Sequence, residues 1–174
     1  MASLRLLVLI ALATASTACG DSQEADTAPG ISQANPLDAE ESALLDELNA
    51  LRADRGVDPV RACTSLNISA SKHSDDMRDR GYSDTTSPDG STPTSRACDA
   101  GYQAGCDPAA VIAEFFAYGN TTGSGTLGQW TQDPGDADSL AATEHAVLGV
   151  GRSLAGDSAV WSLDLGDVDE ASCD

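Results

Sequence analysis

The stretch HSDDMRDRGYSDTTSPDG, residues 73–90, carries the clearest structural signal in this sequence of 174 residues. Its first half continues a helical pattern that begins near Ser65, with apolar or small residues on one face and charged residues on the other. Gly81 is a helix stop, because glycine readily takes the left-handed conformation that ends a helix. Ser87-Pro88-Asp89-Gly90 then supplies the residues of a tight turn. The stretch therefore predicts a helix over 65–80, a stop and a turn.

The sequence on either side of this stretch predicts two further helices. A first amphipathic helix is expected from Asp38 to a stop at Gly56. Its apolar stripe is formed by leucines at Leu44, Leu45, Leu48 and Leu51. Beyond the turn, Thr92 and Pro93 fit the cap and the first position of a short helix. Helices therefore fill the first half of the predicted domain.

The last third of the sequence has the pattern of strands. Residues 146–151 and 160–165 are apolar runs joined by a short turn at 153–157, which predicts a hairpin. Residues 109–118 are also apolar and fit either a strand or a buried helix, and residues 127–131 suggest another helix. Helices followed by a terminal hairpin predict the α+β class, with helices packed on a small antiparallel sheet.

The first eighteen residues, MASLRLLVLIALATASTA, have the pattern of a secretory signal peptide. A basic Arg5 precedes an apolar run that is shorter than the roughly 20 residues of a membrane-spanning helix. Small residues then lead to Cys19, and Ser16-Thr17-Ala18-Cys19 resembles the site at which a bacterial lipoprotein is cleaved and lipidated, with Ser16 in place of the usual leucine. Ordinary cleavage close by, which would release a secreted protein, is the alternative.

These features divide the chain into four segments. Residues 1–18 are the expected signal peptide, and 19–37 are a lipidated N-terminus followed by a polar, flexible tether. The folded domain is expected over 38–168, with a C-terminal tail at 169–174. The protein is therefore expected outside the cytoplasmic membrane, as a lipoprotein that touches the membrane only through the lipid on Cys19, or as a secreted protein.

The charge of the chain restricts its partners. It carries 9 basic and 28 acidic residues, a formal net charge of −19, and Lys72 is its one lysine. Such a chain repels nucleic acid and anionic lipid headgroups, because approach to phosphate brings like charges together. We therefore expect no nucleic-acid partner. The acidic surface favours solubility outside the cell, and buffering of cations is the alternative interpretation.

The five cysteines suggest two disulfides. Lipidation of Cys19 leaves four, an even number that suits an oxidising compartment. Three pairings are possible, and we favour Cys98 with Cys106, which closes a short loop, and Cys63 with Cys173, which ties the start of the second helix to the C-terminus. A zinc site is not expected, because no two of these cysteines have the spacing of a zinc knuckle and neither histidine lies near one.

Several blocks of the sequence, in their order and spacing, resemble the CAP superfamily, or SCP domain, of cysteine-rich secretory, antigen 5 and pathogenesis-related proteins. The resemblance covers roughly residues 42–167 and is strongest to bacterial members. The blocks are LDELNALRADRGVDPV (45–60), SASKHSDDMRDRGYSDTTSPDGSTP (69–93), AEFFAYG (113–119), WTQDPGD (130–136), LGVG (148–151) and WSLDLG (161–166). The resemblance implies a three-layer α-β-α sandwich with a groove.

In many members of that family, two histidines and one or two glutamates line the groove and can hold a divalent metal. Transferred position by position, the two histidine positions hold Thr85 and Asp136 in this sequence. Glu114 occupies the glutamate position, and Asp133 occupies a second glutamate position found in eukaryotic members. Both imidazoles are therefore replaced, and up to three carboxylates remain.

Three interpretations of these groove positions follow from their chemistry. Carboxylates without imidazole suit Ca²⁺ better than a transition metal, so Glu114, Asp133 and Asp136 are candidate calcium ligands. The same three could support a carboxylate-based hydrolase if clustering raised a pKa toward neutrality. Alternatively, Glu114 binds backbone groups, and the two aspartates are loop residues beside Pro134. His73 is expected to be a hydrogen-bonded, partly buried residue, and His145 is expected to be a packing residue, so neither is expected to be catalytic.

The loss of both groove histidines favours a non-catalytic binding module at the cell surface. The family resemblance implies a lipid, sterol, wall polysaccharide or protein ligand. The carboxylate-based hydrolase or calcium-dependent site is the alternative, and a purely structural acidic domain held by disulfides is a third interpretation.

Overall fold

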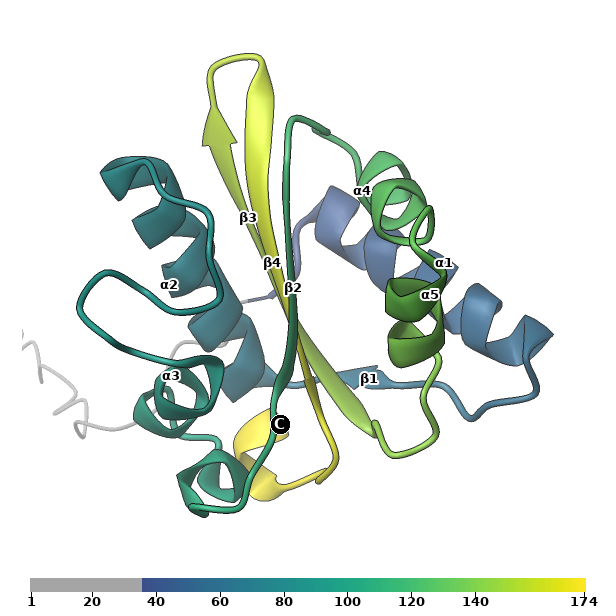
Figure 1. The fold of residues 1–174 in the computed structure, drawn as a ribbon. Helices are drawn as coiled ribbons and strands as arrows, with labels where there is room; N and C mark the ends of the chain where they lie inside the picture. The colour runs from purple at the N-terminus through teal and green to yellow at the C-terminus, as the bar shows by residue number, and fades with distance from the viewer. Residues whose placement is uncertain (1–35) are drawn as a thin grey trace, which may run out of the picture. The chain divides into compact units, whose positions relative to one another are not determined.

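The computed structural model describes residues 36–174, so the predicted signal peptide, Cys19 and nearly all of the tether lie outside the described residues. Helices cover both faces of one four-stranded sheet, which confirms the expected α+β class and the three layers (Figure 1). The elements are α1 (Ala39–Asp54), β1 (Arg61–Ala62), α2 (Thr64–Arg80), α3 (Pro93–Asp99), η1 (Gln103–Cys106), β2 (Ala113–Tyr118), α4 (Gly123–Trp130), α5 (Pro134–Leu140), β3 (Val147–Ala155), β4 (Ser158–Gly166) and η2 (Ala171–Cys173).

The sheet is mixed and not purely antiparallel. Its strand order is β1-β3-β4-β2, in which β3 and β4 form the predicted hairpin and β2 pairs antiparallel with β4. The two-residue β1 runs parallel to β3, and the adjoining Cys63 N–H donates to the Leu148 carbonyl at 2.7 Å. Two residues are too few to show the alternation that reveals a strand in sequence, so this strand was missed.

One face of the sheet packs against α1, α4 and α5 through an apolar core. Figure 1 shows these helices on one side of the sheet and α2 with α3 on the other. Strand β4 supplies the centre of the core with Trp161, Leu163 and Leu165, all of which are 0% exposed. Residues of α1 and α4, including Leu48 and Trp130, close over them. The leucine stripe predicted for the first helix therefore faces this core.

Helix α2 lies close against β3 on the opposite face. Glycine makes this approach possible: a Cβ atom at Gly149 would overlap the backbone of Leu66, and one at Gly151 would overlap the backbone of Ser71. The helix ends as predicted at Gly81, which takes a left-handed conformation with φ of 67°. With α2 fixed on β3 and β4, its side chains can meet those of the strands beneath it.

Strand β2 decides between two alternatives left by the sequence, and helix α5 is an element that the sequence did not predict. Of the two alternatives for 109–118, the strand is observed, as β2. Helix α5 was not predicted, because its seven residues, PGDADSL, carry almost no apolar pattern. Its local signal was Asp133-Pro134, since Asp133 caps the helix by accepting from the N–H groups of Gly135 and Asp136 and Pro134 occupies the first turn.

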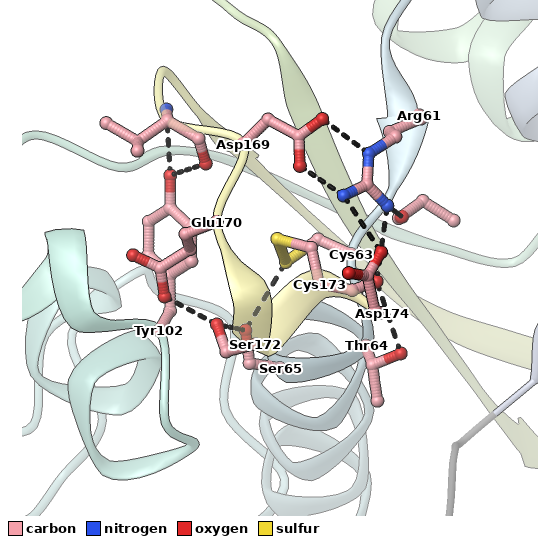
Figure 2. Close-up of a disulfide and its surroundings, with 12 residues drawn as sticks. Arg61, Cys63, Thr64, Ser65, Tyr102, Asp169, Glu170, Ser172, Cys173 and Asp174 are labelled. Atoms are coloured by element: carbon pink, nitrogen blue, oxygen red, sulfur yellow. Dashed lines mark hydrogen bonds and ion pairs between the residues drawn. A yellow bond between two sulfur atoms is a disulfide. The ribbon is translucent and has the colours of Figure 1, made fainter.

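The C-terminal segment is folded against the domain, although it was expected to be a tail (Figure 2). Both favoured disulfides, Cys63–Cys173 and Cys98–Cys106, are present. Arg61 forms ion pairs with Asp169 and, at 3.3 Å, with Asp174. The Glu170 carboxylate accepts from the N–H groups of Gln103 and Ala104 at 2.6 and 3.0 Å. Residues 169–174 therefore join β1, α2 and η1.

Candidate functional site

Glu114 and Asp164 form a buried carboxylate pair between the sheet and α2. They lie directly opposite each other on the antiparallel strands β2 and β4. Neighbouring residues of a strand point to opposite faces of the sheet, so these two side chains lie on the other face from Phe115, Leu163 and Leu165. The Glu114 side chain and the Asp164 residue are both 0% exposed. Two acids are thus placed side by side in the interior.

Besides Asp164, the Glu114 carboxylate contacts three side chains that come from three different elements. Arg96 of α3 donates from Nη2 to Oε1 at 2.6 Å, and the Ser162 hydroxyl of β4 donates to the same oxygen at 3.4 Å. The second oxygen, Oε2, lies 3.5 Å from Nε2 of His73 on α2. Glu114 therefore binds side chains, and not the backbone groups that one interpretation of the sequence suggested.

Arg96 connects this carboxylate to the loop before α3. Its Nη2 also donates to the carbonyl of Thr85 at 2.9 Å, and its Nη1 donates to the carbonyl of Ser91 at 2.9 Å and to the Ser87 hydroxyl at 3.2 Å. Only 10% of the Arg96 side chain is exposed. The guanidinium therefore holds the loop over the buried pair and supplies the positive charge that compensates it.

The burial of the pair changes its protonation. Loss of solvation raises the pKa of Glu114 to about 9, and the nearby Asp164 charge adds to this effect while Arg96 opposes it. Burial likewise raises the pKa of Asp164 to about 6. A single guanidinium faces two carboxyl groups, so the pair holds one proton near neutral pH. This is the behaviour of two acids that share one compensating charge.

His73 is a neutral imidazole above this pair. It is 0% exposed, and burial lowers its pKa to about 4, with the positive charge of Arg96 acting in the same direction. Its Nδ1 lies 3.3 Å from the hydroxyl of Tyr82, which itself donates to Asp76 at 2.6 Å. His73 is hydrogen-bonded, as expected from the sequence, but it is fully buried and not partly buried.

The structure brings two of the four groove positions together and leaves the other two apart. Thr85 and Glu114 meet at the guanidinium of Arg96, although Thr85 contributes its backbone carbonyl and not its side chain. Asp133 and Asp136 lie at the start of α5, on the other side of the sheet from α2 (Figure 1). One oxygen of the Asp133 carboxylate, Oδ1, accepts both capping bonds, at 2.7 and 3.3 Å.

The calcium site that the sequence suggested is therefore not assembled. Within residues 36–174, no group of three or more histidine, cysteine, aspartate or glutamate side chains is placed to hold a metal ion. The physical reason is that the capping role of Asp133 fixes it on one face of the sheet, while strand alternation sends Glu114 to the other. The three carboxylates thus cannot act as one catalytic cluster either.

Sequence reasoning missed Arg96 and Asp164, which complete the buried pair. Asp164 had a signal in the sequence, because it is the one charged residue in the mostly apolar segment VWSLDLG. Alternation along that strand places it on the face away from Trp161 and Leu163. Arg96 had no such signal, since it lies in a seven-residue helix of mixed composition.

His145 serves the fold. Its backbone carbonyl accepts from Nη2 of the fully buried Arg52 at 3.0 Å, and Arg52 also donates to the carbonyls of Leu140 and Ala142 at 3.0 Å each. Burial lowers the pKa of the His145 imidazole. The backbone of His145 thus helps to join the end of α5 to the start of β3.

Comparison with known proteins shows that this architecture occurs in a known family. Residues 45–165 match the model of the CAP family, described as the cysteine-rich secretory protein family. Among curated proteins, no match was found. An outer surface protein from Borrelia burgdorferi has a similar structure, with a TM-score of 0.64 and 18% identity over 79% of this chain and 100% of that one.

Two other bacterial structures are similar. An extracellular protein containing an SCP domain from Bacillus anthracis superposes with a TM-score of 0.61 and 20% identity, over 76% of this chain and 45% of that one. A cysteine-rich secretory protein from Staphylococcus aureus gives a TM-score of 0.51 and 14% identity, over 76% of this chain and 41% of that one. At these identities the likeness establishes the fold.

Proposed function

The chain belongs to the cysteine-rich secretory protein (CAP) family, and from this premise we propose that it is a non-catalytic binding module that works outside the cytoplasmic membrane. The observation that carries the proposal is the state of Glu114, whose side chain is 0% exposed and bound by Arg96 at 2.6 Å. A general base must reach the proton that it removes, directly or through one water molecule. A carboxylate enclosed by α2, α3 and the sheet does not meet that condition.

The remaining groove positions support the same proposal. Thr85 and Asp136 stand where the family resemblance implies histidines, so neither position supplies an imidazole that titrates near neutral pH. The one histidine near the pair, His73, is buried and has a lowered pKa, so it does not replace them. No observation favours the carboxylate-based hydrolase, because its three proposed acids lie on opposite faces of the sheet.

The proposed location follows from the sequence and from the relatives. The export signal at residues 1–18 and the lipidation pattern at Cys19 support an extracytoplasmic lipoprotein, and release after simple cleavage is the alternative. The similar structures from Borrelia burgdorferi and Bacillus anthracis are described as an outer surface protein and an extracellular protein. No helix within residues 36–174 is sufficiently long and apolar to span a bilayer.

The charge of the chain restricts the proposed ligand. A net charge of −19 opposes approach to phosphate-rich surfaces, so we propose a ligand that is neutral, zwitterionic or cationic overall. A lipid, a polysaccharide or a protein could each meet this condition. Strongly anionic lipids and nucleic acids do not.

A substrate panel tests the non-catalytic part of the proposal. The mature protein, its Glu114→Gln variant and its Asp46→Asn variant are incubated with fluorogenic ester, peptide and phosphodiester substrates. Asp46 is an exposed aspartate of α1 and serves as the matched control. We expect turnover at the level of the blank in all three proteins. Turnover that Glu114→Gln abolishes and Asp46→Asn preserves would refute the proposal.

Partition into detergent tests the proposed anchor. The full-length chain and a Cys19→Ser variant are expressed with their signal segment in a bacterial host, and the products are separated by Triton X-114 phase partition. We expect the unmodified chain in the detergent phase and the variant in the aqueous phase, because an acyl chain adds about 0.8 kcal/mol of membrane affinity per buried methylene. Equal partition of the two proteins would favour simple cleavage and release.

A further inference from the structure

A second candidate site adjoins Arg96, the residue that compensates the buried pair. A hollow of about 270 Å³ opens between α2, the loop at 89–91 and the C-terminal half of α3. It is lined by Ser69, Lys72, Asp89, Ser91, Arg96 and Asp99. We refer to it as the Lys72 hollow. Its volume is below the roughly 300–1,000 Å³ of sites for drug-sized ligands, so its ligand must be smaller than those.

Lys72 brings an uncompensated positive charge to this hollow. It is the one lysine in a chain with 28 acidic residues, and it is exposed. Within residues 36–174, every arginine has carboxylate or carbonyl partners, but Lys72 has no ion pair or hydrogen bond. A surface so rich in carboxylates offers a lysine many partners. An unpaired ammonium facing a hollow therefore remains available to an anionic group.

Asp99 brings an uncompensated negative charge to the same hollow. It is the last residue of α3, and it too is exposed and without an ion pair among the described residues. A carboxylate at the C-terminal end of a helix is placed against the helix dipole, which favours cations there. Helix stability therefore does not explain this residue, whereas an available carboxylate at the hollow suits a cationic group.

The other charged side chains of the lining, Arg96 and Asp89, already have hydrogen-bond or ion-pair partners within the protein. Arg96 is held by Glu114 and by loop carbonyls, although its Nε is a buried donor without a partner. Asp89 accepts from the N–H and the hydroxyl of Ser91 at 2.9 and 2.8 Å, and it lies 3.6 Å from Arg80. Lys72 and Asp99 are thus the two free charges of the lining, and they have opposite signs.

We propose that the Lys72 hollow binds a small zwitterion of the amino-acid type. Its carboxylate pairs with the Lys72 ammonium, and its ammonium group pairs with the Asp99 carboxylate. A zwitterion matches both charges without adding net charge to an acidic protein, and it fits the small volume. This inference rests on the proposed function, because it gives the binding module a ligand class.

Titration with small probes tests this inference. The mature protein is titrated with L-alanine, D-alanine, acetate and methylammonium, up to about 20 mM, and followed by NMR chemical-shift changes. Paired contacts at an open site predict saturable binding of alanine with a Kd of about 1 mM. Acetate and methylammonium each satisfy one charge, so we expect each to bind at least tenfold more weakly than alanine. The two alanine enantiomers separate recognition of charge from recognition of the side chain.

Variants at the two free charges provide the decisive comparison. Lys72→Met and Asp99→Asn should each weaken alanine binding at least tenfold, whereas Arg55→Met, which changes an exposed residue of the α1 end, should leave it unchanged. Both test residues are exposed, so the variants should fold. Absence of saturable alanine binding, equal binding of acetate, or binding that survives both variants would overturn the inference. A blank substrate panel would still leave the proposed function standing in each of those cases.

Discussion

The two faces of the sheet are stabilised by different kinds of interaction, although the same strand serves both. From β4, Trp161 and Leu163 enter an apolar core beneath α1 and α4, while Ser162 and Asp164 face α2 in a polar interior. The apolar face depends on area removed from water, at about 25 cal/mol per Å². The polar face depends on matched charges and hydrogen bonds. The first should therefore be insensitive to pH, and the second should respond both to pH and to the loss of one cation.

The largest effect is expected on the apolar face. Trp161→Ala removes a side chain that is 0% exposed and whose Nε1 donates to the Asn120 carbonyl at 2.7 Å. Truncation of a buried tryptophan costs about 3–5 kcal/mol of unfolding free energy, because a cavity remains. Urea unfolding at pH 5 and at pH 8 should give the same loss. Val111→Ala, at a residue 78% exposed, is the control and should change stability by less than about 0.5 kcal/mol.

A somewhat smaller effect is expected when the polar face loses its cation. Arg96→Met leaves Glu114 and Asp164 without compensation and should cost about 3 kcal/mol at pH 8. The loss should shrink at pH 5, because both carboxyl groups can then be protonated. The double variant Arg96→Met with Asp164→Asn should recover much of the loss at pH 8, because Asp164 carries the remaining negative charge of the pair at that pH. If the loss were equal at both pH values, the compensating role of Arg96 would be wrong.

The pH dependence of the unmodified protein gives a third comparison. The folded state holds a proton on Glu114 with a pKa of about 9, whereas the unfolded chain releases it near 4.5. Because the folded state binds more protons between these values, the unfolding free energy falls as pH rises, by at most about 1.4 kcal/mol per pH unit. His73, with a folded pKa of about 4, acts in the opposite direction, but only below about pH 6.5.

The test is therefore made above pH 6.5, with chemical unfolding at several pH values up to 9. The unmodified protein should lose stability across this range, and Glu114→Gln should show a flatter profile. Asp46→Asn, at an exposed acid of α1, should retain the unmodified slope. A flat profile in the unmodified protein would show that Glu114 is already ionised at pH 6.5.

The smallest effect is expected at Asp133. Asp133→Ala removes the cap of α5 and should cost about 1 kcal/mol of unfolding free energy, measured by thermal or urea unfolding. Because no cluster of acidic side chains within residues 36–174 surrounds Asp133, millimolar calcium should leave the melting temperature of both proteins unchanged. Asp46→Ala, which touches no cap, should have almost no effect. A rise in melting temperature with calcium that Asp133→Ala removes would restore the calcium interpretation.

The apolar face was the more predictable of the two. The leucine stripe of α1 and the apolar runs of the terminal hairpin are local patterns, and each was confirmed. The polar face depends on the register that places Glu114 opposite Asp164. That register cannot be inferred from the sequence of either strand alone, because it depends on how two separate strands pair. Thr85 illustrates the same limit, because it acts through a backbone carbonyl that any residue type would supply.

The Cys63–Cys173 disulfide has a consequence for how an exported chain reaches this fold. Its two cysteines are 110 residues apart in the sequence. Strand β1, beside Cys63, likewise cannot pair until β3 is available. During vectorial translocation, Cys63 emerges long before Cys173 and meets Cys98 first, only 35 residues away. By loop-closure entropy the shorter, incorrect loop is favoured roughly fivefold. Maturation should therefore need thiol exchange that corrects early pairing, and an oxidant that lacks isomerase activity would trap misfolded forms of this protein.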